Sequence, residues 1–188
     1  MNLPALRRIL FCIAACFLAA GIPAPAQQNA GEILAHANAE AAAAHKNVMM
    51  VFSASWCTPC HMFDAFLTDP ETGPIMRKHF AIARFDVGEK PGDKKHADTP
   101  GAEKLRASLG GADAGYPYLI ALDPSGQVLV NSYRPVEGKP GNADTNIGYP
   151  YLHVEIDWFM EMLRRSAPAM SAEETHAVRS WLEGRGEK

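Results

Sequence analysis

Two patterns of hydrophobic and polar positions alternate along this chain of 188 residues. Continuous apolar runs of strand length predict strands, buried on both faces, over residues 48–54 and 81–87. Apolar segments on both sides of the turn sequence Asp123-Pro124-Ser125-Gly126 predict a hairpin over 117–133. Apolar residues at helical spacing predict helices near residues 29–44, 60–68, 71–79, 102–109 and 152–165, and a further one from residue 171.

The starts of two of these helices carry a capping signature. Asn29 is followed three residues later by Glu32, and Ser171 by Glu174, the spacing of a capping box. The order of elements is helix, strand, helix, strand, helix, hairpin, helix. A strand–helix–strand unit implies two parallel strands with a right-handed crossover, and the hairpin adds antiparallel strands. The prediction is an α/β fold with a central mixed β-sheet flanked by helices and an extra C-terminal helix.

Two polar segments separate the later elements. Residues 88–101 are rich in charge, glycine and proline and predict a surface insertion, in which the charges and His96 belong to a solvated loop. Residues 134–148 form a second turn-rich loop. Neither segment has the hydrophobic periodicity of a separate domain, so we expect one domain over residues 27–188 with a loop insertion and a C-terminal helical extension.

The first 26 residues have the layout of a signal peptide. Arg7 and Arg8 precede a short apolar run over 9–20, and Ala24-Pro25-Ala26 places small residues where a signal peptidase cleaves. The apolar run is too short to span a bilayer comfortably, so no stable membrane insertion is expected after cleavage. Export to the periplasm or another extracytoplasmic space follows. A lipoprotein signal, with an anchor on Cys16, is a second interpretation of the same segment.

Composition narrows the function. With 47% hydrophobic and 21% charged residues the chain is an ordinary globular protein, and its net charge of −3 gives no basic surface for nucleic acid. Cleavage of the leader leaves Cys57 and Cys60 as the only two cysteines. A disulfide that closes so small a loop adds little stability through chain entropy, so the pair is expected to serve chemistry.

Cys57-Thr58-Pro59-Cys60 follows a buried strand and opens a helix. A nucleophilic cysteine must be a thiolate, and a free thiol has a pKa of about 8.5. Unpaired N–H groups and the dipole at a helix N-terminus favour the negative charge on Cys57. Cys60 lies one turn further on the same face, where it can resolve a mixed disulfide. Pro59 fits the first turn, which needs no N–H there, and stiffens it.

Two other interpretations use the next residue. Cys57, Cys60 and His61 also match the attachment pattern of a c-type haem, although a haem site needs a second axial ligand and an apolar pocket usually built among helices. The same three residues are soft ligands for copper or zinc, as in a metal-delivery protein, but no fourth ligand is evident. The dithiol interpretation requires no cofactor and no metal.

The order of elements together with Trp56-Cys57-Thr58-Pro59-Cys60 resembles the thioredoxin superfamily over residues 29–165. The segment around Asp69-Pro70 is similar to an exported, thioredoxin-like branch of it. The resemblance implies a thioredoxin-like fold, with Cys57 as nucleophile and Cys60 as resolving thiol. It also implies a cis-proline at Pro117.

The sequence Gly-Tyr-Pro-Tyr-Leu occurs twice, at 115–119 and at 148–152. The first copy enters an apolar strand, as the family's proline does, and is therefore assigned to the site. The second precedes an amphipathic helix, where Pro150 suits the first turn. In the resemblance, the residue before the cis-proline pairs through its backbone with an extended substrate segment. Tyr116, Pro117 and Trp56 are thus expected to bind substrate.

One position departs from the family. Many thioredoxins bury an aspartate in the strand before the motif, and that position is Val51 here. His61 and Asp64 are the nearby candidates to manage the proton of the resolving thiol, and each is also an ordinary helix-surface residue. His61 is therefore expected to support the site. Pro59 is expected to support it as well, because it stiffens the first turn of the helix.

The expected function is an exported thiol:disulfide oxidoreductase. Thr58-Pro59 places no charge between the thiols, which favours a reductant or an interchange role over a strong oxidant. Its expected partners are protein disulfides and a separate redox protein that restores the dithiol.

Overall fold

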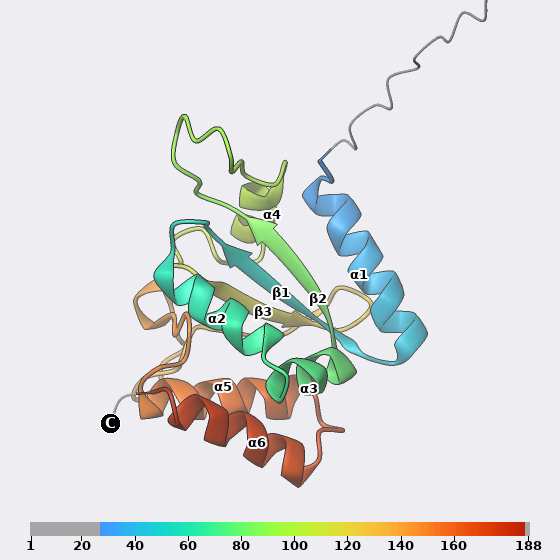
Figure 1. The fold of residues 1–188 in the computed structure, drawn as a ribbon, viewed down its shortest axis with the longest axis vertical. Helices are drawn as coiled ribbons and strands as arrows, with labels where there is room; N and C mark the ends of the chain where they lie inside the picture. The colour runs from blue at the N-terminus through green and yellow to red at the C-terminus, as the bar shows by residue number, and fades with distance from the viewer. Residues whose placement is uncertain (1–26, 187–188) are drawn as a thin grey trace, which may run out of the picture.

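The computed structural model describes residues 27–186. The predicted signal peptide and the alternative anchor on Cys16 lie outside these residues. The described helices and strands follow the predicted order (Figure 1). They are α1 (Ala30–Ala44), β1 (Asn47–Ser53), α2 (Thr58–Thr68), α3 (Thr72–His79), β2 (Phe80–Asp86), α4 (Ala102–Ser108), β3 (Tyr118–Leu122), β4 (Val128–Asn131), the 3₁₀ turn η1 (Ala143–Thr145), α5 (His153–Ser166) and α6 (Ala172–Glu183).

The four strands form one mixed sheet in the order β2-β1-β3-β4. β1 pairs with β2 in parallel and with β3 in antiparallel register, and β3 and β4 form the predicted hairpin. In the hairpin turn, Asp123 accepts hydrogen bonds from the backbone N–H groups of Ser125 and Gln127. β1, the strand that enters the cysteine motif, therefore lies inside the sheet with a partner on each edge.

Both faces of β1 are buried, as its continuous apolar run predicts. Met49 and Val51 point to one side, into a core shared with α2, α3, α5 and α6. Val48, Met50 and Phe52 point to the other side, into a core shared with α1 and α4. The alternation follows from the two-residue period of a strand. The resulting fold has helices on both faces of the sheet, which confirms the predicted architecture (Figure 1).

The predicted capping boxes are present at α1 and α6. Asn29 accepts the N–H of Glu32, and Glu32 accepts the N–H of Asn29. Ser171 and Glu174 make the same reciprocal pair. The expectation for Pro150 is wrong. α5 begins at His153 after the cap residue Leu152, so Pro150 lies in the connection before the helix.

Glu174 also joins α6 to α3. Its carboxylate contacts Lys78 at 2.6 Å and His79 at 3.0 Å, in addition to its cap bond. The hydrogen bond from Lys78, followed by the cap and His79, lowers the pKa of Glu174 from 4.5 to about 2. A carboxyl group with a depressed pKa stabilises the fold above its unfolded pKa, and this stability is lost as the pH falls through the folded value.

We therefore expect Glu174→Gln to lower the free energy of unfolding by about 1 kcal/mol at pH 7. The difference from the parent protein should shrink as the pH falls from about 4.5 towards 2. Urea unfolding across this pH range measures it. Glu173→Gln, on the same turn, is the matched control. A difference that stays constant down to pH 2 would contradict the role of the ionised carboxylate.

Candidate active site

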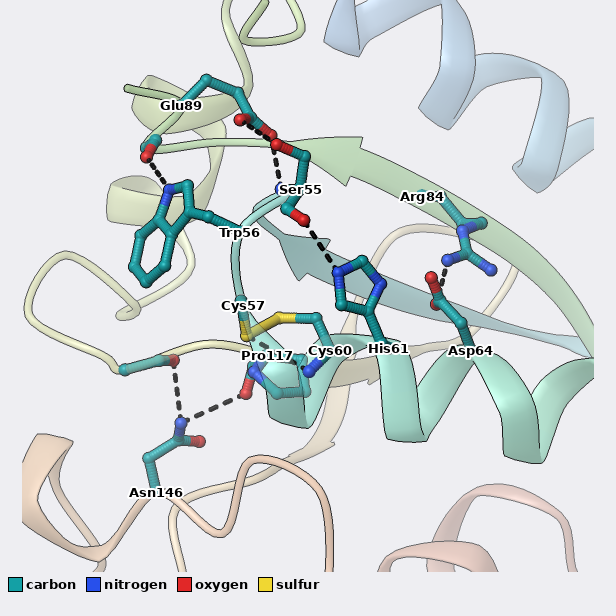
Figure 2. The surroundings of a disulfide bond; sticks show 12 residues. Ser55, Trp56, Cys57, Cys60, His61, Asp64, Arg84, Glu89, Pro117 and Asn146 are labelled. Atoms are coloured by element: carbon teal, nitrogen blue, oxygen red, sulfur yellow. Dashed lines mark hydrogen bonds and ion pairs between the residues drawn. A yellow bond between two sulfur atoms is a disulfide. The ribbon is translucent and has the colours of Figure 1, made fainter. Parts of the chain in front are cut away.

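The cysteine motif sits where β1 ends and α2 begins. The backbone N–H of Cys57 donates to Ala54 O at 3.1 Å, which closes the turn between strand and helix. Cys57 is the N-cap of α2, and Pro59 lies in the first turn, as predicted. Cys57 and Cys60 are joined by a disulfide, with their Cα atoms 5.2 Å apart (Figure 2). The structure is thus the oxidised form of the pair.

The helix start favours negative charge on the sulfur of Cys57. Its Sγ accepts the N–H of Cys60 at 3.1 Å, in the place where a Ser or Asp side chain normally caps a helix. Two contributions therefore favour a Cys57 thiolate when the pair is reduced, this hydrogen bond and the positive end of the helix dipole. Both cysteines are buried, with 4% of Cys57 and 2% of Cys60 exposed. Little of either cysteine is therefore accessible to a reaction partner in the oxidised form.

The loop before β3 lies against the disulfide. The peptide bond between Tyr116 and Pro117 is cis. Tyr116 packs against the small cluster formed by Ala54 and the two cysteines. Figure 2 places Pro117 beside the cysteine pair. The first Gly-Tyr-Pro copy therefore supplies the tyrosine and the proline that lie against the cysteine pair.

Two aromatic side chains stand at the edge of the site. The rings of Trp56 and Tyr116 meet edge to face, with centroids 5.9 Å apart, and Trp56 is 47% exposed. The guanidinium of Arg106 lies over the ring of Tyr116 at 5.3 Å. Burial raises the pKa of the Tyr116 hydroxyl, so it stays neutral at physiological pH. The pair forms an apolar wall beside the cysteines.

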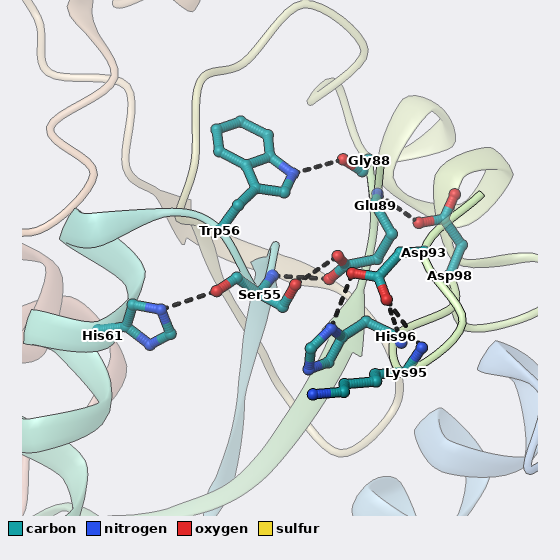
Figure 3. A network of polar contacts seen from close by, with 9 residues as sticks. All are labelled: Ser55, Trp56, His61, Gly88, Glu89, Asp93, Lys95, His96 and Asp98. Carbon is teal, nitrogen blue, oxygen red and sulfur yellow. Dashed lines mark hydrogen bonds and ion pairs between the residues drawn. The ribbon is translucent and has the colours of Figure 1, made fainter. Parts of the chain in front are cut away.

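The insertion contributes more to the site than the sequence predicts. Most of residues 88–101 are exposed, as expected, but Glu89 is half-buried. Its carboxylate accepts the N–H and the hydroxyl of Ser55, each at 2.6 Å. The indole N–H of Trp56 donates to Gly88 O at 2.8 Å. Figure 3 shows how these contacts fasten the start of the insertion to the two residues before Cys57.

The rest of the insertion supports Glu89. Its backbone N–H donates to the carboxylate of Asp98 at 2.8 Å. The ring of His96 pairs with Asp93 at 3.0 Å, and this hydrogen bond raises the pKa of His96. These contacts fold the charged loop back on itself beside the motif (Figure 3). The chain positions the Glu89 carboxylate through this local network.

The two candidates for managing the proton of Cys60 are engaged elsewhere. His61 Nε2 lies 2.8 Å from Ser55 O, and Asp64 forms an ion pair with Arg84 (Figure 2). Val51, at the family's aspartate position, is buried in the apolar core. His61 thus supports the turn before Cys57. A proton relay through His61 or Asp64 has no support from these contacts.

A groove of about 620 Å³ extends from the motif across the proline loop to the start of α5. Pro59 and Met62 line it on the α2 side, and Tyr116 and Gly148 line it on the loop side. Tyr151 and Leu152 complete its far end, and each is about two-fifths exposed. The groove is therefore open and mostly apolar, and its lining residues Pro59 and Tyr116 place it beside the cysteine site.

A sequence profile of a family described as thioredoxin-like matches residues 30–124, which is just over half of the chain. The chain belongs to the thioredoxin-like family. The match includes β1, the cysteine motif and the proline loop, the three parts that meet at the site. The resemblance carried by the Trp-Cys-x-Pro-Cys motif is thus confirmed, and so is the predicted fold class.

Comparison with solved structures finds matches at low sequence identity. A disulphide isomerase from Xylella fastidiosa Temecula1 is 20% identical, with 88% of this chain and 98% of that chain covered and a TM-score of 0.49. A DsbH oxidoreductase is 20% identical over 75% of this chain and 83% of its own, with a TM-score of 0.44. A thioredoxin-fold protein from Helicobacter pylori is 16% identical over 74% and 84%, with a TM-score of 0.41. No curated protein matches the sequence.

Within this thioredoxin-like domain, the sequence indicated the cysteines, the aromatic pair and the proline. It missed three polar residues that hold them, Ser55, Glu89 and Asn146. Asn146 donates to the carbonyls of Gly115 and Pro117, on both sides of Tyr116. Glu89 and Asn146 lie in loops rich in polar residues, where nothing in the local pattern separates a buried contact from a solvated one.

Proposed function

We propose that this thioredoxin-like protein is an exported thiol:disulfide oxidoreductase that reduces or interchanges disulfides in extracytoplasmic proteins. The observation that carries the proposal is the Cys57–Cys60 pair across the first turn of α2, with the proline loop beside it. A close-spaced, buried pair at a helix N-terminus suits reversible exchange better than structural support.

The reaction follows from the asymmetry of the two thiols. The Cys57 thiolate attacks one sulfur of a client disulfide, forms a Cys57–client bond, and releases the other client sulfur as a thiolate that takes up a proton. Cys60, deprotonated, then attacks the Cys57 sulfur and releases the second client thiol. The client gains two electrons and two protons, and the Cys57–Cys60 disulfide remains. Interchange uses the same steps with a client thiol as the final attacking group.

Trp56, Tyr116 and Pro117 are proposed to bind the client. The exposed face of Trp56 and the ring of Tyr116 give apolar contact beside the sulfurs. No described residue makes a hydrogen bond to the backbone N–H or C=O of Tyr116. These groups can pair with an extended segment of the client, as the edge of a sheet does. Such backbone pairing accepts many side-chain sequences.

The redox potential of the Cys57–Cys60 pair tests the proposal. Thr58 and Pro59 add no positive charge between the thiols, so we expect a potential in the reducing or interchange range, below that of a strong oxidant. The pair is equilibrated with glutathione buffers and the reduced protein is then mixed with a disulfide-bonded client. A reduced protein that transfers no electrons to a client disulfide would end the proposal. The proposed function also includes a separate partner protein that re-reduces the Cys57–Cys60 disulfide after each cycle.

Export is proposed from the N-terminal sequence. Within residues 27–186, no helix is long and apolar enough to cross a membrane. We predict that the mature protein begins at or near Gln27, because Ala24 and Ala26 match the cleavage pattern. Intact mass of the exported protein measures this. A mass that includes lipid on Cys16 would show that the exported protein is anchored to a membrane and is not released into the periplasm.

Copper or zinc delivery through Cys57, Cys60 and His61 gains no supporting observation. In the oxidised form the two sulfurs are bonded to each other, and His61 is turned to Ser55 O. The c-type haem interpretation is weakened because the motif lies between β1, a strand inside the sheet, and α2, and not among packed helices. Titration of the reduced protein with one equivalent of metal, followed by an absorbance scan, separates these classes from the dithiol.

A further inference from the structure

The amide oxygen of Asn146 is held in place by a hydrogen bond from Ser132. The backbone N–H of Leu119 donates to the hydroxyl oxygen of Ser132 at 3.0 Å, so the hydroxyl proton is free to point outward. Ser132 donates that proton to Asn146 Oδ1 at 2.6 Å. Ser132 is fully buried at the end of β4 and is itself tied to β3 by its backbone. The oxygen of the Asn146 amide therefore faces the sheet.

The amide nitrogen then faces the proline loop. Asn146 Nδ2 donates to Gly115 O at 2.9 Å and to Pro117 O at 3.2 Å. An amide nitrogen has two hydrogens, so both donors are used. The opposite orientation would place Oδ1 against two carbonyl oxygens. The Ser132 hydroxyl on one side and the two carbonyls on the other thus fix a single orientation of Asn146. Figure 2 shows the two bonds from its nitrogen.

The two carbonyls that Asn146 holds flank Tyr116, whose own N–H and C=O no described residue uses. Gly148, two residues after Asn146, lies next to the same loop. A Cβ at this position would come within 3.5 Å of Tyr116 O. Asn146 Nδ2 thus holds the neighbours of Tyr116 on both sides without using the Tyr116 backbone, and Tyr116 itself lines the groove.

We propose that Asn146 is a positioning residue for client capture, which fixes the loop so that the free backbone groups of Tyr116 can pair with an extended client segment. This inference rests on the proposed thiol:disulfide exchange. It assigns to the turn-rich loop of residues 134–148 a role in the binding step and none in the reactivity of the sulfurs.

Asn146→Asp provides the test, because a carboxylate still accepts from Ser132 but turns an oxygen towards two carbonyls. The probe is an extended peptide whose single cysteine is in a disulfide with glutathione. We expect KM for this peptide to rise about tenfold, the effect of roughly one lost hydrogen bond, with kcat changed less than about twofold. The rate at which iodoacetamide alkylates reduced Cys57 should stay at the parent value.

Asn142→Asp is the matched control, since it adds the same charge in the same loop. Its side chain accepts from the N–H of Asp144, which a carboxylate also does, so KM should not change. Equal KM values for Asn146→Asp and Asn142→Asp would overturn the inference. A fall in kcat and in alkylation rate at constant KM would also overturn it, because that would assign Asn146 to the sulfurs.

If Asn146→Asp does not fold, Asn146→Ala decides by the same criterion, since it removes both donors without adding charge. A rise in KM supports the inference and an unchanged KM overturns it. Failure of the proposed function is distinct. In that case the parent protein itself exchanges no disulfide with the peptide, and both proposals fall.

Discussion

Cys57→Ser should lower disulfide reduction by about three orders of magnitude or more, as loss of a nucleophile does, whereas Cys60→Ser should leave the first step intact. A serine hydroxyl is not ionised at neutral pH and cannot form the mixed disulfide. With Cys57 present and Cys60 absent, the mixed disulfide forms and has no internal thiol to resolve it. Clients should therefore stay covalently bound to the Cys60→Ser variant.

Non-reducing electrophoresis and intact mass measure the trapped complexes. The double variant Cys57→Ser, Cys60→Ser is the control for clients held without a covalent bond. Alkylation of the reduced parent protein should modify Cys57 first, since it is the N-cap of α2. Preferential labelling of Cys60, or trapping by Cys57→Ser, would reverse the two assignments.

Glu89→Ala is expected to loosen the turn that carries Cys57. It removes the acceptor of two hydrogen bonds from Ser55 and leaves a half-buried N–H without its partner. Hydrogen bonds to a charged group of this kind stabilise a fold by about 1–2 kcal/mol when partly exposed. We expect that loss in urea unfolding, together with an altered alkylation rate of reduced Cys57.

Glu89→Gln tests whether the turn is stabilised by the two hydrogen bonds to Ser55 or by the negative charge of Glu89. Its amide can accept the N–H of Ser55 with the oxygen and donate to the hydroxyl with the nitrogen, so the turn keeps both contacts. Stability should return close to that of the parent. Glu173→Ala, an exposed glutamate on α6, controls for loss of a surface charge. If Glu89→Ala matches Glu173→Ala in both measurements, the contact with Ser55 has no energetic role.

The fold could be predicted because its strands and helices carry strong local signals. The apolar run of β1 is continuous and of strand length, which is typical of a strand buried on both faces, and Met49 and Met50 indeed point into opposite cores. Asn29 and Ser171 mark helix starts through side chains that bond to their own turn. Such signals depend on neighbours three or four residues away, which the sequence displays directly.

The polar residues that hold the site, Ser55, Glu89 and Asn146, have no such local signal in the sequence. Ser55 and Glu89 are 34 residues apart, and Asn146 lies 31 residues from Gly115. The first contact exists because the sheet brings the ends of β1 and β2 together, and the second because it brings the start of β3 beside the end of β4. Pro150 shows that a local sequence signal can also give a wrong prediction. Its position ahead of an amphipathic helix suits a first turn, but Glu155 accepts the N–H groups of Tyr151 and Leu152, and the helix begins only at His153.

The position of β1 inside the sheet has a consequence for how the protein opens. β1 has a partner strand on each edge and a packed core on each face. Its amide protons are therefore expected to exchange with solvent deuterium only through global unfolding, at the slowest rate in the chain. The 88–101 segment, mostly exposed, should exchange far sooner. Cys57 thus lies between a part of the domain that opens rarely and one that opens readily, since it follows β1 directly and the turn before it is held at Ser55 by Glu89.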